Sequence, residues 1–325
     1  MRVCPTIHHQ PDCHYHSLQE AIAAALPGDH VVLSGGIYEE GAIITTPGLV
    51  LQGESGAHLR GHAVESKAAL VVKADGVTID GIECSDISVR DRNGACVRNE
   101  GRDLTIRNVY FHDNEQGVLG GSQSGGVLRV EGSLFERNGF GGQAHGVYVN
   151  RKTETFVFRE NRILATTGAG HGLKSRARRT IIENNVIAGL DGQDSRAIDL
   201  PNGGEVVIRG NVLEKGPKSD NGQMIGIALE GEHHTVNETL IEDNLFLFDT
   251  VPEGVIQSIA RAVGLLPAKG IVLVSKSPGP VVIRNNTIVG AQAIGDGPVT
   301  HGNQLFADRR AADLPPYPAL PDANN

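Results

Sequence analysis

Residues 180–189 read TIIENNVIAG, and residues 281–290 read VVIRNNTIVG. In both stretches a short apolar run is followed by a charged residue and two asparagines, and a second apolar run then ends at glycine. Runs of this length suit short β-strands, and asparagine and glycine suit the breaks between them. The unit therefore predicts two short strands that are joined by a turn.

Related units recur along most of the chain. The third residue of each apolar run is Ile79, Ile106, Val130, Phe158, Ile182, Ile208, Ile241 and Ile283. Successive anchors are 27, 24, 28, 24, 26, 33 and 42 residues apart, so the first five steps are nearly regular and the last two carry insertions. The repeating units contain no helical period long enough to cross between strands, so the strands must stack on one another. The repeat predicts a solenoid of β-coils.

Two columns of turn residues accompany the repeat. Asparagine lies three residues past five of the anchors, at Asn161, Asn185, Asn211, Asn244 and Asn286. We expect these asparagines to adopt the left-handed bend between strands and to hydrogen-bond from coil to coil. A second column opens the following strand, with Gly117, Gly146, Gly172, Gly226 and Gly270, and Ala197 once.

The segment before the first coil predicts a helix. Ser17 and Glu20 form a capping box, the apolar stripe holds Leu18, Ile22, Ala25 and Leu26, and Pro27 ends the helix. An amphipathic helix in this place would cover the open end of the solenoid.

Three further expectations concern the later segments and the division of the chain. A helix-like stretch over 255–266 reads as an excursion that packs on a coil, and the proline-rich residues 314–325 read as a strap or a disordered end. We expect an N-terminal segment with the cap helix over 1–29, a β-helix over 30–291, and a C-terminal strap or tail over 292–325.

Composition excludes several classes of protein. Of 325 residues, 42 are glycine, none is tryptophan, and aromatic residues make up 4%, which rules out a helical bundle built on large side chains. No apolar run reaches the length of a bilayer span. The formal charge of −9 disfavours a nucleic-acid binder, because phosphate neutralisation needs a basic face. An anionic ligand would therefore need a local basic patch.

The N-terminal residues leave two questions open. Cys4 and Cys13 lie among histidines at 8, 9, 14 and 16, which fits either a zinc-binding tract or, as we favour, a cap loop with a Cys4–Cys13 bridge. Met1–Pro5 shows no basic segment followed by an apolar one. We expect a cytoplasmic protein, or a periplasmic or secreted one from which a signal has been removed.

The cap region and repeats resemble a known superfamily. The stretch SLQEAIAAALPGDHVVLSGGIYEE at 17–40 and the repeats quoted above are similar to the right-handed parallel β-helix of the pectate-lyase-like superfamily, and the likeness extends to about residue 291. HGVYVN at 145–150, GHGLKSRARRTIIENN at 170–185 and AIDLPNGG at 197–204 resemble a group of bacterial β-helix repeat proteins. The resemblance implies an all-β, single-stranded solenoid and a polysaccharide ligand that is cleaved or epimerised. It does not assign one activity.

Strand parity brings polar side chains to one face of the middle coils. If the column of glycine or alanine opens each strand, alternate residues beyond it face outward. The residues expected to form files on this face are Tyr148, Lys174 and Asp199; His145, His171 and Arg196; and Asn150 and Arg176, with Glu230 on the next coil. Other coils have apolar residues or glycine at these places, so the polarity is local.

These residue types suit elimination across a uronate. Such a reaction needs cations for the carboxylate and a base for the C5 proton. We expect Arg176 and Arg196 to bind the carboxylate, with Lys174 or His171 as base. The expected supporting residues are Tyr148 as the acid to the leaving oxygen, His145 beside it, Asp199 as an orienting group, and Asn150, Arg178 and Glu230 as further substrate contacts.

Other functions remain open from the sequence. Asp199 and Glu230 could serve a glycoside hydrolase. A uronan epimerase abstracts the same proton, although the Asp-Pro-His motif of alginate epimerases is absent. A non-catalytic glycan-binding solenoid would use the same cations, and a solvated face with no function would also be polar. No cofactor is certain, although the resemblance implies calcium in many lyases, and Asp191, Asp194 and Asp199 keep a Ca²⁺ site open.

Overall fold

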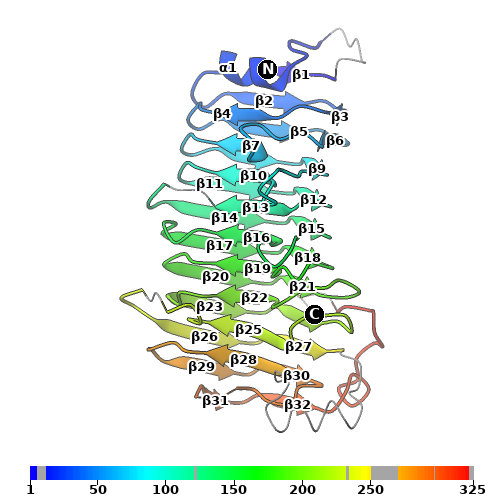
Figure 1. Ribbon diagram of the computed structural model, residues 1–325, viewed down its shortest axis with the longest axis vertical. Coiled ribbons are helices and arrows are strands. Elements are labelled where there is room, and N and C mark those ends of the chain that lie inside the picture. Colours follow the sequence, from blue (N-terminus) through cyan, green and yellow to red (C-terminus); the bar gives the residue numbers. More distant parts are fainter. Residues whose placement is uncertain (6–11, 121–122, 232–233, 250–269, 296, 322–325) are drawn as a thin grey trace.

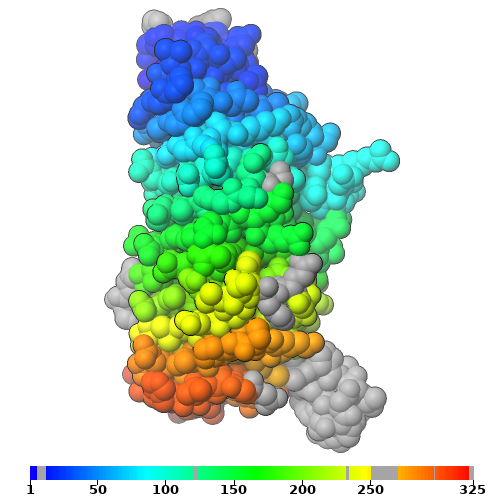
Figure 2. All heavy atoms as spheres, turned by 90° about the vertical axis from the view of Figure 1, so that its left-hand side faces the viewer, coloured from blue at the N-terminus to red at the C-terminus, as the bar shows by residue number. Residues whose placement is uncertain are grey.

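The computed structural model describes residues 1–5, 12–120, 123–231, 234–249, 270–295 and 297–321. In this part of the chain most coils contribute one strand to each of three parallel sheets, and the coils stack along a single axis (Figure 1). Figure 2 shows the same order on the surface, where layers follow the sequence from one end to the other. The prediction of an all-β, right-handed parallel β-helix is confirmed.

The strands are named by sheet. Sheet A contains β1 (Arg2–Val3), β2 (His30–Leu33), β5 (Val50–Gly53), β8 (Thr78–Asp80), β11 (Leu104–Arg107), β14 (Val127–Glu131), β17 (Thr155–Arg159), β20 (Arg179–Glu183), β23 (Glu205–Arg209), β26 (Glu238–Glu242), β29 (Val281–Arg284) and β31 (Val299–His301). Sheet B contains β3 (Gly36–Tyr38), β6 (Ala57–Arg60), β9 (Glu83–Ser85), β12 (Tyr110–His112), β15 (Leu134–Glu136), β18 (Arg162–Leu164), β21 (Val186–Ala188), β24 (Val212–Lys215), β27 (Leu245–Phe248), β30 (Thr287–Val289) and β32 (Gln304–Phe306). Sheet C contains β4 (Ala42–Ile44), β7 (Ala68–Val72), β10 (Ala95–Asn99), β13 (Gln116–Gly120), β16 (Val147–Val149), β19 (Leu173–Ser175), β22 (Ile198–Leu200), β25 (Gln223–Ile227) and β28 (Ile271–Ser275).

The core is a column of inward side chains. Ile182 is fully buried and pairs in register with Phe158 on one neighbouring coil and Ile208 on the other. The rings of Phe111 and Phe135 stack with their centroids 4.5 Å apart. Since coils repeat at the strand spacing, roughly 4.8 Å, each inward residue packs on its equivalents above and below.

The asparagine column forms a hydrogen-bonded ladder at the turn between sheets A and B. Asn185 donates its backbone N–H and its side-chain NH₂ to Oδ1 of Asn211, both at 2.9 Å. The same pair of bonds links Asn161, Asn185, Asn211, Asn244, Asn286 and Asn303 in sequence order. The left-handed residue is the one before each ladder asparagine, for example Asn184 with φ of 57° and Asp243 with φ of 57°. The expectation that the ladder asparagines themselves adopt this bend was wrong, because their side chains point into the turn to bond.

A short helix closes the N-terminal end. Helix α1 spans Leu18–Ala24, shorter than the predicted 17–26, and lies beside the N-terminus above β2 (Figure 1). Ser17 accepts a hydrogen bond from the N–H of Glu20, as the capping box predicts. Leu18 and Ile22 are buried, but Leu26 is 69% exposed and does not belong to the stripe. None of the helices in the described residues has the length and apolar character needed to cross a membrane.

The C-terminal residues fold back along sheet B. Strands β31 and β32 extend the coils to Phe306, past the expected boundary at residue 291. Leu314 and Leu320 then pack against an apolar patch that includes Val212 and Leu247. Arg309 donates to both carboxylate oxygens of Asp249 at 2.7 and 2.6 Å. The described part of the tail is thus a strap, whereas the helix expected over 255–266 lies outside the described residues.

The four cysteines form two disulfides. Cys4 pairs with Cys13 in the N-terminal segment, as favoured from the sequence. Cys84 of β9 pairs with Cys96 of β10 inside one coil. These pairs leave no thiol for a zinc-binding tract at Cys4 and Cys13.

Candidate functional site

A polar cluster lies on sheet C in the middle coils. We define the central cluster as Tyr148, His145, Lys174, His171, Arg176, Arg196, Asp199 and Glu230. Strand pairing places Tyr148 beside Lys174 and Lys174 beside Asp199, in the file that the sequence predicts. On one side of the cluster, Leu119 is the strand partner of Tyr148. On the other side, Val274 is the strand partner of Gly226. The cluster is therefore bounded by apolar residues along the axis.

The predicted register fails by two residues at β25. Asp199 pairs with Gly226, so Glu230 lies in the turn after the strand rather than on it. A shift of two residues preserves which side chains face outward. Gly226 lies inside β25 and not at its start, so it is not one of the turn glycines. Glycine is needed here because a side chain would collide with the central cluster. A Cβ there would lie 2.8 Å from Cδ of Arg196 and 2.8 Å from Oδ1 of Asp199.

Two carboxylates and three cations make up the charged part of the central cluster. The ammonium of Lys174 lies 2.9 Å from Oε1 of Glu230 and 3.5 Å from Oδ2 of Asp199. Arg196 contacts the other oxygen of Asp199 at 3.3 Å, and Arg176 contacts the other oxygen of Glu230. With neutral histidines, these five groups carry a net charge of about +1. The cluster can therefore accept one further negative charge.

The two histidines form a short ladder. Nδ1 of His145 accepts a hydrogen bond from the backbone N–H of His171 at 3.1 Å, and Nδ1 of His171 accepts one from the N–H of Arg196 at 3.1 Å. Their rings stack with centroids 5.0 Å apart. Burial, together with nearby cations, lowers the pKa of His145 to about 2 and that of His171 to about 3. Both rings are thus neutral near pH 7, with the proton on Nε2.

This tautomer changes the role expected for His171. Its Nε2 carries the proton and lies 3.5 Å from Oδ2 of Asp199, so the ring faces the site as a donor. The nitrogen that could accept a proton is already bonded to the backbone of Arg196. His145 is 3% exposed and is engaged in the same way. Neither ring offers a free basic nitrogen to a ligand.

The two carboxylates have different environments. The side chain of Asp199 is 4% exposed, and burial raises its pKa against the opposing effect of Lys174 and Arg196. The side chain of Glu230 is 45% exposed. Partial burial raises the pKa of Glu230, but hydrogen bonds from Lys174 and Arg176 outweigh it and hold the pKa below its usual value. Glu230 is therefore the accessible, ionised member of the pair.

Two residues missed by sequence reasoning fix the arginines. Asn202 accepts from Nη1 of Arg176 at 2.8 Å, while Nε of Arg176 donates to the hydroxyl of Tyr148 at 3.0 Å. Gln223 accepts two bonds from Arg196, at 3.1 and 2.6 Å. Asn202 lies in a turn and Gln223 precedes the glycine used for alignment, so strand parity could not find either one.

Other predicted residues lie apart from these contacts. Arg178 contacts Glu154 and Glu205, each at 2.6 Å, and the side chain of Asn150 accepts from the N–H of Lys152 within a turn. The carboxylates considered for calcium do not converge. Asp194 pairs with Lys215 at 2.6 Å, Asp191 with Lys218 at 3.7 Å, and Asp199 with the cations of the central cluster.

The coiled architecture and the polar face of sheet C define a β-helix protein with a candidate ligand site on its side. The family model described as right handed beta helix region matches residues 47–215. The chain belongs to this right-handed β-helix family. A search of curated proteins finds no match to the sequence.

Solved structures with the same fold act on different polymers. The alginate lyase from Paenibacillus sp. str. FPU-7 is 18% identical with a TM-score of 0.57, over 89% of this chain and 94% of that one. Pectate lyase Pel9A is 15% identical with a TM-score of 0.57, over 95% and 79%. The pectin methylesterase from Aspergillus niger is 15% identical with a TM-score of 0.53, over 78% and 85%. At these identities the likeness shows the fold alone.

Proposed function

We propose that this protein is a lyase that cleaves a uronate-containing polysaccharide by β-elimination at the central cluster. The observation that carries the proposal is the pair formed by Lys174 and Arg176, which binds both oxygens of one carboxylate, that of Glu230. A site that holds a carboxylate in this way is suited to the carboxylate of a uronate. The net charge of about +1 leaves the cluster one anion short of neutrality.

Glu230 can give way to a ligand. It lies in a turn and is 45% exposed, so its side chain can leave without disturbing a strand. Arg176 would stay in place, because Tyr148 and Asn202 hold it from the protein side. A preorganised guanidinium that meets a uronate carboxylate would stabilise the negative charge that develops when the C5 proton is removed.

The residues of the central cluster can share the remaining steps. Once Glu230 has left, Arg176 holds the uronate carboxylate and Lys174, in its amine form, takes the C5 proton; the C5–H electron pair forms the C4–C5 double bond, and the C4–O bond breaks. The hydroxyl of Tyr148 then protonates the departing oxygen. Lys174 is favoured over His171 as the base, because Nδ1 of His171 already accepts a hydrogen bond from Arg196 and its Nε2 carries a proton that faces Asp199. Asp199 positions Lys174, and Arg196 adds positive charge beside it.

The fold comparisons support a uronate polymer as the ligand class. Two of the similar structures are an alginate lyase and a pectate lyase, and pectate and alginate are both polyuronates. We extend that substrate class, but neither specific substrate, to this chain. The absence of tryptophan fits a site that relies on charge more than on stacking against a neutral sugar.

One observation favours glycoside hydrolysis as a second candidate. Asp199 and Glu230 flank the same ammonium, and their pKa values are shifted in opposite directions. Divergent pKa values are what an acid and a base or nucleophile need in a glycosidase. In this alternative both carboxylates are indispensable and Lys174 is an electrostatic partner.

A panel of pectate, alginate, a sulfated glycan and a neutral glucan separates these activities. The assay measures absorbance of unsaturated uronate and new reducing ends in parallel. A lyase produces both signals, a hydrolase produces reducing ends only, and an epimerase changes the uronate composition with neither. Binding without any change in the polymer would replace the proposal with a glycan-binding solenoid.

Substitutions test the assigned roles. Lys174→Ala should lower the rate of elimination by at least about 100-fold while much of the affinity remains, because the base acts mainly in the transition state. Arg107→Ala is the matched control, since Arg107 pairs with Asp80 on sheet A, away from the central cluster. Equal losses in both variants would contradict the assignment of Lys174.

A further inference from the structure

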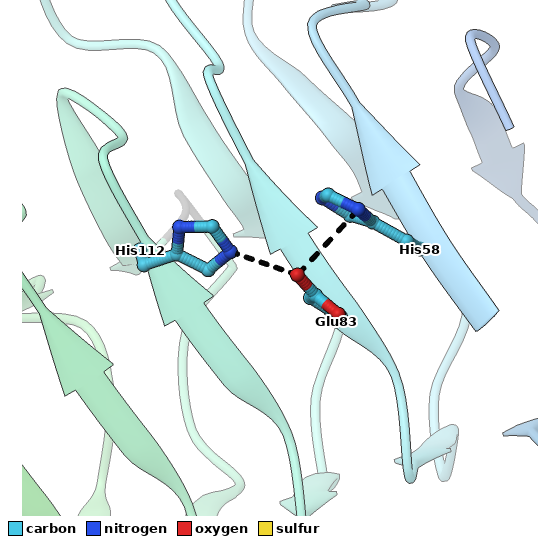
Figure 3. A group of neighbouring side chains, drawn as sticks. All are labelled: His58, Glu83 and His112. Atoms are coloured by element: carbon cyan, nitrogen blue, oxygen red, sulfur yellow. Dashed lines mark hydrogen bonds and ion pairs between the residues drawn. The ribbon is translucent and has the colours of Figure 1, made fainter. Parts of the chain in front are cut away.

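A second polar cluster lies on sheet B and has no part in the proposed function. Figure 3 shows His58 of β6 and His112 of β12 directed toward Glu83 of β9, which lies between them. Oε1 of Glu83 is 3.0 Å from Nε2 of His112 and 3.5 Å from Nδ1 of His58. The three side chains come from successive coils and face away from the core.

The partners of His112 assign its tautomer. Nδ1 of His112 lies 2.7 Å from Oδ2 of Asp113, a carboxylate that also accepts two bonds from Arg137 at 2.8 Å. An ionised carboxylate only accepts hydrogen bonds, so Nδ1 carries the proton. Nε2 faces Oε1 of Glu83 at 3.0 Å, and the proton between these two atoms is the one that a metal ion would displace. The ring of Tyr110 stacks on His112 with centroids 4.3 Å apart and fixes its orientation.

A chain of hydrogen bonds from His58 through Ser85 to Asp86 assigns the tautomer of His58. Ser85 donates its hydroxyl proton to Asp86 at 2.9 Å, so its oxygen is left to accept from Nε2 of His58 at 2.8 Å. Nδ1 of His58 is then unprotonated, and this is the nitrogen that faces Glu83. Each histidine thus directs toward Glu83 the nitrogen that is available to a metal ion.

Three ligand atoms that converge in this way suit a cation, which would displace the proton between His112 and Glu83. We propose that Nδ1 of His58, Oε1 of Glu83 and Nε2 of His112 bind one divalent transition-metal ion of the zinc class. Imidazole nitrogens with a carboxylate are typical zinc ligands, whereas calcium and magnesium prefer oxygen alone. Two ligands of a tetrahedral zinc ion lie roughly 3.4 Å apart, close to the two spacings around Oε1 of Glu83.

The surroundings resemble those of ordered metal sites. Asp113 and Ser85 hold the non-ligating nitrogens of the two histidines, which is the usual function of outer partners of metal-bound histidine. The side chains of His58 and His112 are 14% and 15% exposed, while that of Glu83 is 35% exposed. Three protein ligands leave one tetrahedral position, which could hold water or an anionic group.

Titration of the full chain with zinc chloride tests the site. After chelator treatment and buffer exchange, calorimetry and competition with a chromophoric chelator should report one site that is lost in His58→Ala, His112→Ala and Glu83→Gln. Asp113→Asn should weaken affinity roughly 10- to 100-fold, because it releases the His112 ring without removing a ligand. Cobalt substitution should give visible bands of a low-symmetry tetrahedral ion in the wild type and not in His112→Ala.

Two controls keep the test decisive. His62→Ala removes an exposed histidine outside the cluster, and a variant in which His8, His9, His14 and His16 are all replaced by alanine removes the alternative N-terminal histidines. Both should bind zinc as the wild type does. Circular dichroism confirms that each variant is folded. If the folded wild type binds no zinc, or if the three ligand variants retain the site, the cluster is a proton-sharing ion pair and the proposal is overturned.

Discussion

The carboxylate of Glu230 reaches the ammonium of Lys174 at 2.9 Å, although Glu230 follows β25 and Lys174 lies on β19, two coils away. The contact spans the intervening strand β22, where Asp199 takes the other side of the same ammonium. Glu230 therefore occupies the outer face of a carboxylate-binding pair. In the proposed function it is the group that a uronate carboxylate replaces.

Replacement of Glu230 by glutamine should strengthen the binding of polyuronates. The substitution removes a competing carboxylate and raises the charge of the central cluster by one unit. We expect a gain of about 1 kcal/mol, roughly fivefold in Kd, at low ionic strength and less at high salt. The measurement is a binding titration with a uronate oligosaccharide at two salt concentrations.

The same variant discriminates between the candidate reactions. A lyase with Lys174 as base should retain turnover in Glu230→Gln, whereas a hydrolase that depends on Asp199 and Glu230 should lose it. Weaker binding together with lost activity would show that Glu230 contacts the substrate directly rather than competing with it.

Gly226→Ala should impair the site without unfolding the protein. The backbone of Gly226 has an ordinary φ, so alanine is tolerated there, but its Cβ would meet Arg196 and Asp199 at 2.8 Å. The flexible Arg196 must move, and its bonds to Gln223 would be broken. We expect a reduction in polyuronate affinity or rate of about tenfold, with unfolding free energy changed by less than about 1 kcal/mol. A large loss of stability with unchanged binding would contradict this account of the glycine.

Stability should fall as the pH is lowered from 7 to 5. The folded protein keeps His145 and His171 neutral, because burial lowers their pKa values to about 2 and about 3, whereas in the unfolded chain they titrate near 6.5. The unfolded state binds more protons in this window, so protonation favours unfolding. Each histidine contributes about 2 kcal/mol to the loss at pH 5. Urea unfolding at several pH values measures the slope.

A variant isolates this effect from the carboxylates, which also titrate on acidification. Asn at position 145 can accept the same backbone N–H through its side-chain oxygen, but it does not titrate. His145→Asn should therefore remove about half of the pH dependence assigned to the pair, while His62→Ala, an exposed histidine, should leave it unchanged. Identical slopes in all three proteins would show that the histidine ladder does not control the acid sensitivity.

The core column predicts a sharp contrast between two aspartate substitutions. Ile182→Asp would bury an unpaired carboxylate between Phe158 and Ile208, at a cost of more than about 3 kcal/mol. Thr105→Asp faces outward on β11 and should change stability by about 0.5 kcal/mol or less. Thermal unfolding followed by circular dichroism compares the two, and similar melting temperatures would contradict the assigned inward and outward faces.

Sequence periodicity was sufficient to predict the fold because a solenoid repeats its local rules. Anchors such as Ile182 recur at nearly regular spacing, and each one identifies the inward face of its strand and the position of the following turn. The strand pairing of one coil therefore predicts that of the next. This prediction failed at β25, where Asp199 pairs with Gly226, because a glycine was used as the marker of the strand's first position. Gly226 is glycine to make room for Arg196, and no strand pattern distinguishes that reason from a turn.

The candidate sites were less predictable because their contacts cross coils and turns. Strand parity was enough to align Tyr148, Lys174 and Asp199, which lie on consecutive strands. Asn202 holds Arg176 from a turn, and a turn has no period to follow. Strand parity counted from the glycine or alanine column applies only to the strands of sheet C, so it does not predict His58 and Glu83 on sheet B. A scan of outward positions on sheet B could have found them.

The asparagine ladder has a net dipole along the axis of the β-helix. In every step the amide NH₂ of one asparagine points toward the next coil and its oxygen toward the preceding one, as in the bond from Asn185 to Asn211. The side-chain dipoles therefore add along the axis, and each bond polarises the next. A break in the stack would leave bare donors on the N-terminal fragment and bare acceptors on the C-terminal fragment. Along the asparagine column the two cut surfaces are therefore complementary to each other.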